Sequence, residues 1–422
     1  MVFTVELRPG NSLGMFALGM PVSEVLKHIQ DNEDLYPRIE IKYSEQEPLD
    51  HDLVLNFPGS GFHLRFDPCT QRLRLIEIYD VSRIQVRYAN SIVGGPESPT
   101  TFVQMYSLFG PTYPGSFDSG RNVYLLHYPG LLLLFPIPAP YASCCMNLQA
   151  EVPLEFPDGT TPVVSRLCVY HCRDEASSLS QPSTGVHAAP HILSRVVNAA
   201  PPTLHPGSSY MEKVEAWLGR GLRFVGSERA MEFGCTPQDV WADLGAPGGI
   251  TYKNVDTMVI HAKQEMCTSG ANSTAGAAGV GGGGASSRDY FYNYYRLGLD
   301  VLFDGHLHEA KKFVLHTNAV GHVDFNTYLK CNFVVRRGAW PGEEEQAEDS
   351  VGADATWARI QQVMGPAQRP AVNVSGSACN PFGPTYMYGY PNVVFEVMKN
   401  GHLASVTLWK VRQSSAKQYL GV

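Results

Sequence analysis

The sequence predicts an internally duplicated α+β protein, in which each half is built from helices and antiparallel β-hairpins or meanders. Segments of the first half reappear in the second half in the same order, and helix-like segments alternate with pairs of short apolar strands. The chain has 422 residues, of which 44% are hydrophobic and 11% aromatic. That is enough apolar material for a large core and two domain-sized units.

The first repeated element is a short amphipathic helix. Residues 18–29 align without a gap on residues 233–244, an offset of 215. In both segments a glycine, Gly19 or Gly234, precedes a polar capping segment, and apolar residues follow at helical spacing. We therefore expect a helix with one buried face in each half.

The second repeated element is a β-hairpin. Residues 61–80 align on residues 298–317 through a shared Phe-Asp pair, at an offset of 237. A further hairpin at 392–409 carries Asn400-Gly401, which aligns on Asp304-Gly305. Both dipeptides are typical of two-residue hairpin turns, whose central residues need positive φ.

The third repeated element is a helix that ends at Gly-Pro. Residues 100–111 align on residues 355–366, an offset of 255. Glycine can adopt the left-handed cap and proline cannot continue the helix. The growing offset predicts insertions in the second half, which we assign to a Gly/Ala tract at 263–289, expected to be disordered, and an acidic loop at 338–354.

These repeats define the predicted domains. We expect a first α+β half at 1–172, a Pro/Ser/Ala-rich linker at 173–215 and a second α+β half at 216–422. The apolar run at 122–140 is interrupted by proline and glycine, whereas a membrane helix needs roughly 20 consecutive apolar residues. It is better interpreted as two buried strands around a Tyr-Pro-Gly turn.

Composition excludes several classes of protein. The net charge of -8 and the lack of a basic block argue against a nucleic-acid binder. The start of the sequence shows no export signal and no glycine for myristoylation. The odd number of nine cysteines, with no CxxC pair, favours reduced thiols and a cytoplasmic location.

A histidine-rich segment is the strongest candidate for chemistry. His306, His308 and His316 lie within eleven positions, and imidazole is a common zinc ligand. They could form a metal-binding or hydrolytic module, with Cys331 or His322 as further ligands. The alternative is a plain hairpin, because His306 aligns on His402, where no second ligand follows, so that only His308 lacks a counterpart.

Other motifs are weaker. The glycine run at 279–284 fits GxGxxG but has no strand before it and no helix after it. Cys168, His171 and Cys172 have no second ligand pair, and Cys144-Cys145 lies beside no ligand type. No GxSxG, GxxxxGK[ST] or HExxH motif occurs. The sequence thus predicts no enzyme and no catalytic, cofactor-binding or metal-binding residue, and it leaves the partner-binding residues unassigned.

One short motif suggests partner binding. Trp241-Ala-Asp-Leu244 follows Asp239 and is similar to the acidic-aromatic-x-x-aliphatic pattern read by autophagy modifier proteins. Because Trp241 and Leu244 fall on the repeated helix, we interpret them as core residues.

The whole chain resembles the phagosome assembly factor 1 family, sometimes called LIN-10-like. The resemblance rests on the start at 3–14, the hairpin at 57–80, two Gly-Pro-Thr-Tyr segments from 110 and 383, and the closing stretch at 390–410. It implies a non-enzymatic autophagy regulator in the cytoplasm. Its implied partner is the β-propeller protein breast carcinoma amplified sequence 3, which binds phosphoinositides, and both would be recruited to the phagophore assembly site. The helix segments also resemble β-lactamase-inhibitor-like modules.

Overall fold

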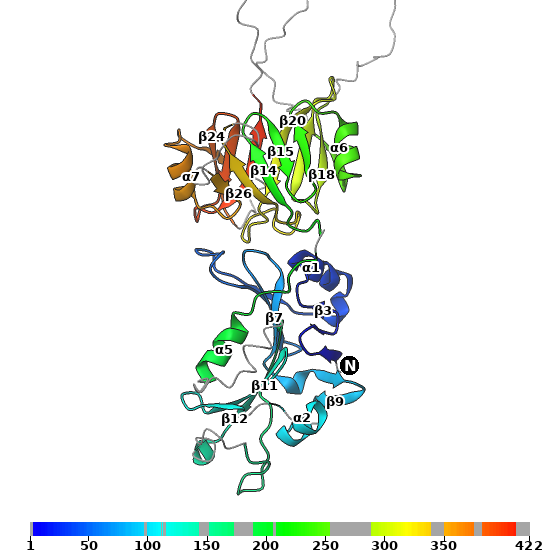
Figure 1. The fold of residues 1–422 in the computed structure, drawn as a ribbon, viewed down its shortest axis with the longest axis vertical. Coiled ribbons are helices and arrows are strands. Elements are labelled where there is room, and N and C mark those ends of the chain that lie inside the picture. The colour runs from blue at the N-terminus through cyan, green and yellow to red at the C-terminus, as the bar shows by residue number, and fades with distance from the viewer. Residues whose placement is uncertain are drawn as a thin grey trace, which may run out of the picture. The chain divides into compact units, whose positions relative to one another are not determined.

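The computed structural model describes residues 3–96, 99–110, 112, 115–142, 152–172, 189–205, 208–253, 288–338, 350–374 and 382–410. The chain divides into two compact units, Met1–Ser208 and Ser209–Val422 (Figure 1). The predicted duplication corresponds to these two units.

In its described residues, the first unit contains two sheets and three α-helices. Its elements are β1 (Thr4–Arg8), β2 (Ser12–Leu13), β3 (Phe16–Ala17), α1 (Val22–Asp31), β4 (Glu40–Lys42), β5 (Leu53–Phe57), β6 (Phe62–Phe66), β7 (Leu73–Ile78), β8 (Gln85–Tyr88), β9 (Ser91–Gly94), α2 (Phe102–Phe109), β10 (Ser116–Asp118), β11 (Val123–Tyr128), β12 (Leu131–Pro136), β13 (Arg166–Tyr170) and α5 (Ala189–Val197). One sheet has the order β3-β2-β1-β8-β9, and the other has the order β10-β11-β12-β13-β7-β6-β5-β4.

The second unit repeats this plan. Its elements are β14 (Lys213–Trp217), β15 (Gly221–Phe224), β16 (Arg229–Glu232), α6 (Pro237–Leu244), β17 (Gly249–Tyr252), β18 (Tyr290–Tyr294), β19 (Leu299–Phe303), β20 (Ala310–His316), β21 (Asn332–Arg336), β22 (Ser350–Gly352), α7 (Trp357–Met364), β23 (Ala371–Asn373), β24 (Thr385–Tyr390), β25 (Val393–Val397) and β26 (Leu403–Trp409). Its sheets have the orders β16-β15-β14-β21-β22 and β17-β18-β19-β20-β26-β25-β24-β23.

The two units match strand by strand. Each strand of the first corresponds to the strand numbered thirteen higher in the second. The pairs β1–β8 and β14–β21 are both parallel, whereas the neighbouring pairs are antiparallel. The hairpins β6–β7 and β19–β20 even share a register shift, between Arg65 and Phe66 in one and Leu302 and Phe303 in the other. The described architecture is dominated by sheets, with few and short helices.

The repeated helices form where the sequence predicts them. Val22, Val25 and Ile29 give α1 one buried face. The helices α2 and α7 end at Gly110 and Gly365, whose φ angles of 79° and 86° are the left-handed values that favour glycine. In the second unit, α6 and α7 lie at opposite ends of the sheets (Figure 1).

The insertions differ in part from the prediction. Most of the Gly/Ala tract and the centre of the acidic loop lie outside the described residues, and the end of the predicted loop forms β22. The second unit also has a third insertion, which the sequence did not indicate. The connection from β20 to β21 spans residues 317–331, whereas the equivalent connection in the first unit spans only 79–84. Part of the growing offset therefore comes from this longer connection.

The stretch predicted as a linker contributes to the first unit. It contains α5, whose Val196 is buried against Leu75, Leu125 and Leu132 of the eight-stranded sheet. In Figure 1, α5 lies on the opposite side of the sheet from α1 and α2. An apolar layer thus covers part of the outer face of this sheet.

The apolar run forms the predicted pair of strands. β11 and β12 pair in antiparallel fashion around Tyr128 and Leu131, and Gly130 in the turn has a φ of 75°. Among the described residues, the helices are all too short or too polar to span a bilayer.

Candidate functional site

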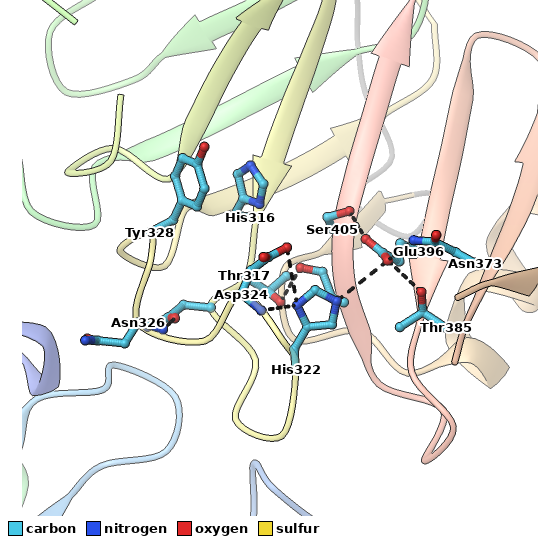
Figure 2. A network of polar contacts seen from close by, with 12 residues as sticks. His316, Thr317, His322, Asp324, Asn326, Tyr328, Asn373, Thr385, Glu396 and Ser405 are labelled. Carbon is cyan, nitrogen blue, oxygen red and sulfur yellow. Dashed lines mark hydrogen bonds and ion pairs between the residues drawn. The ribbon is translucent and has the colours of Figure 1, made fainter. Parts of the chain in front are cut away.

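On the outer face of its eight-stranded sheet, the second unit has a buried glutamate where the first unit has a leucine. Glu396 on β25 is paired with Ser405 on β26. The matching pair in the first unit is Leu134 on β12 and Arg166 on β13. The long connection 317–331 supplies side chains that contact this face (Figure 2).

Glu396 is the centre of this network. It is only 7% exposed. Its Oε1 accepts hydrogen bonds from the Thr385 hydroxyl at 2.6 Å and the Asn373 amide at 3.2 Å, and its Oε2 accepts one from the Ser405 hydroxyl at 2.6 Å. The carboxylate is thus buried with donors on both oxygens, as a buried charge requires.

His322 approaches the same carboxylate from the connection 317–331. Its Nδ1 accepts a hydrogen bond from the Asp324 backbone N–H at 3.2 Å, so in the neutral imidazole the proton sits on Nε2. That atom lies 3.6 Å from Glu396 Oε1 (Figure 2). Burial by itself would raise the pKa of Glu396, but the nearby His322 ring together with hydrogen bonds from Ser405 and Thr385 outweighs it and lowers the pKa to about 2.

A second cluster holds the end of the same connection. His316 Nε2 lies 2.9 Å from Asp300 Oδ2, and the Tyr328 ring stacks on the His316 ring at 3.9 Å. The Tyr328 hydroxyl donates to Asp300 Oδ2 at 2.9 Å, and burial followed by the Asp300 charge raises its pKa. Asn293 donates to Asp300 Oδ1 at 2.8 Å. Polar contacts therefore hold the connection to the sheet at His322 and at Tyr328.

This second cluster has a counterpart in the first unit. Asn56, His63 and Tyr79 precede Asn293, Asp300 and His316 by the hairpin offset of 237. The Tyr79 hydroxyl donates to Asn56 Oδ1 at 3.0 Å, and the two rings of His63 and Tyr79 lie 5.7 Å apart. A polar triplet at this place is thus a property of the duplicated scaffold.

The alternative histidine site does not assemble. His306 is exposed, and its backbone N–H donates to Asp304 Oδ1 at 2.8 Å. His308 Nδ1 lies 2.9 Å from the Tyr290 hydroxyl, whereas His316 contacts Asp300. Within the residues that the structure describes, no three His, Cys, Asp or Glu side chains are placed to hold a metal ion.

The further candidate ligand Cys331 is buried. The residue is 3% exposed, and burial raises the pKa of its thiol to about 12. The thiolate that binds metals is therefore disfavoured there.

The predicted two-residue turn at Asp304-Gly305 is wrong. Gly305 does not have a positive φ, and the left-handed residue of this loop is His308, at 53°. The loop is closed by a hydrogen bond from the Asp304 N–H to the Glu309 carbonyl. In the shorter loop between β25 and β26, the Met398 N–H donates to the His402 carbonyl in the same way. Asp304 thus corresponds to Met398 and not to Asn400.

The cysteines considered as ligands differ in burial. Cys168 is buried on β13, where burial, followed by the charge of Glu77, raises the pKa of its thiol. Cys172 is only partly buried. Cys144, Cys145 and the glycine run at 279–284 lie outside the described residues.

Trp241 is not a core residue, which corrects the sequence interpretation. It is 51% exposed on α6, while Val240 beside it is fully buried. Leu244 does pack against the core. A helix turns successive side chains by about 100°, so neighbouring apolar residues need not share the buried face.

A small pocket opens beside the Glu396 network. It measures about 20 Å³, which is room for about one water molecule. Its walls come from four separate stretches of the second unit, and they include His322, Asn373, Thr385, Phe382 and Lys399. The sequence did not indicate this pocket, because its walls meet only after the sheet has formed.

Comparisons with known proteins agree with the resemblance found in the sequence. The family model of phagosome assembly factor 1 matches residues 12–409. A protein of the same family from Arabidopsis thaliana is 46% identical over 411 residues, covering 96% of this chain and 92% of that protein. A relative from Drosophila melanogaster is 31% identical over 443 residues, covering 96% and 94%. One from Caenorhabditis elegans is 29% identical over 421 residues, covering 93% and 90%.

No solved structure matches the chain. The family match spans both units, and three relatives share it over nearly their whole length. The chain therefore belongs to the phagosome assembly factor 1 family.

Proposed function

We propose that this protein is a non-enzymatic regulator of autophagy that acts as a complex subunit. Its partner in the proposal is the β-propeller protein breast carcinoma amplified sequence 3, and both are recruited from the cytoplasm to the phagophore assembly site. The family description, which names an assembly factor, supports the general role. The partner and the place of recruitment follow from the resemblance of the sequence.

One structural observation supports a docking protein over an enzyme. Asn373, Thr385 and Ser405 all donate hydrogen bonds to the buried Glu396, whereas exposed apolar side chains lie on outermost strands of the large sheets. These are Ile41 on β4, Ile250 and Tyr252 on β17, and Val372 on β23, between 48% and 66% exposed. Apolar groups on a free sheet edge are suited to partner binding.

Contact with phosphoinositides is assigned to the partner in this proposal. The chain has a net charge of -8, and polybasic segments are what attract a protein to anionic lipid surfaces. A subunit of this kind would reach the membrane through the propeller. It would then supply a protein-binding surface there.

The proposal is tested by reconstitution with purified proteins. The full chain and the propeller protein are mixed and separated by size-exclusion chromatography, and we expect a stable complex. Vesicles with and without phosphoinositides are then floated with the chain alone, with the propeller alone and with both. We expect the chain to float only with the propeller and only on phosphoinositide vesicles.

Imaging in starved cells tests recruitment. Cells that lack the propeller protein should show the fluorescent chain spread through the cytoplasm, and re-expression should restore its spots at forming phagophores. Spots that persist without the propeller, or a chain that never elutes with it, would refute the proposal.

A further inference from the structure

β23 is an outermost strand with an apolar, extended edge. In the described part of the chain it pairs only with β24, through the register Ala371 to Met387 and Asn373 to Thr385. Val372 and Val374 are 58% and 70% exposed. Side chains two positions apart in extended backbone point to the same side. The edge thus offers backbone hydrogen-bonding groups together with two aligned valines.

Two basic residues lie close to this strand on a protein with a net charge of -8. Residues 355–410 contain four basic residues, Arg359, Arg369, Lys399 and Lys410, and the single acid Glu396, which is buried. Arg369 comes two residues before β23, and Lys399 lines the pocket next to Asn373. Both side chains are exposed. Such a local field attracts acidic groups.

We propose that β23 is the docking edge for an extended acidic segment of the partner. The segment adds a strand alongside β23, with its apolar side chains on Val372 and Val374. Its carboxylates face Arg369 and Lys399. Strand addition obtains affinity from backbone hydrogen bonds and specificity from alternate side chains. This inference rests on the proposed function and names the surface through which the partner binds.

The first experiment compares β23 with an exposed apolar side chain elsewhere in the second unit. Val374→Asp and Lys399→Glu place negative charge at or beside β23. Leu307→Asp places it on the loop between β19 and β20 as the matched control, because Leu307 is also exposed, at 56%. Binding to the purified propeller protein is measured by titration. We expect the β23 variants to bind at least about tenfold more weakly and the control to bind like wild type. Added salt should weaken the wild-type complex, because exposed charges are screened.

A photo-crosslinking residue at position 374 identifies the occupant in the purified complex. We expect it to label an acid-rich segment of the propeller protein, and the same residue at position 307 to label none. Unchanged affinity of both β23 variants refutes the inference while the complex itself stands. Cross-links to a second copy of this chain, or vesicle binding by the chain alone that Val374→Asp abolishes, also refute it. Absence of any wild-type complex refutes the proposed function as well.

Discussion

His308 occupies in the second half the backbone position that Gln71 occupies in the first. Their φ angles are 53° and 54°, and they are 237 residues apart, the offset of the two hairpins. The His308 N–H donates to the Asp304 carbonyl at 3.0 Å, and the Gln71 N–H donates to the Asp67 carbonyl at 2.8 Å. The histidine without a counterpart in the sequence is therefore a turn residue with a clear structural equivalent.

This equivalence predicts how position 308 tolerates substitution. His308→Gln introduces the residue of the other half and should leave the midpoint of urea unfolding within error of wild type. His308→Val places a β-branched residue in left-handed backbone and should cost about 1–2 kcal/mol. Equal stability of the two variants would show that the loop does not hold this conformation.

The Glu396 network predicts a graded loss of stability. Glu396→Leu, which copies Leu134 of the first unit, leaves the hydroxyls of Thr385 and Ser405 without their acceptor. Each buried unsatisfied group costs about 1–3 kcal/mol, so we expect a loss of about 3 kcal/mol or more in urea unfolding. Adding Thr385→Val and Ser405→Ala should recover much of it. A triple variant no more stable than the single one would contradict this account.

The lowered pKa of Glu396 predicts a pH dependence. Its folded-state value of about 2 lies below the roughly 4.3 of an unfolded glutamate. The ionised carboxylate therefore stabilises the fold above about pH 4.3, and this contribution, up to about 3 kcal/mol, is lost as the pH falls from there toward 2.

Urea unfolding of wild type and Glu396→Gln between pH 7 and pH 3 measures this effect. The stability difference should be constant from pH 7 to about 5 and should narrow below that. A difference that stays constant down to pH 3 would assign the stability to something other than this ionisation.

Cysteine reactivity provides a further test of the buried sites. Burial raises the pKa of Cys331 to about 12, whereas Cys69 is exposed. Because the thiolate is the reactive species, iodoacetamide at pH 8 should label Cys69 quickly and Cys331 only after denaturation. Peptide mass spectrometry quantifies both sites in one sample. Rapid native labelling of Cys331 would be inconsistent with its burial at 3% exposure.

The sequence by itself determined the duplication and its repeated elements. Helix periodicity and glycine ends located α1, α2, α6 and α7, and the Phe-Asp match located the equivalent hairpins. These signals are local, because a helix cap or a hairpin turn depends on residues that are a few positions apart in the sequence. The resemblance of the whole chain likewise led to the right family.

Only the tertiary structure decided which residues cover the outer face of each eight-stranded sheet. In the first unit α5 packs on part of this face, and in the second unit Glu396, His322 and their hydroxyl partners lie there. Those partners are separated by up to 83 residues in the sequence. Which side chains meet depends on the order of strands in the sheet, and no local pattern encodes that order. The same reason explains why Trp241 is exposed and why the three predicted histidines lie apart.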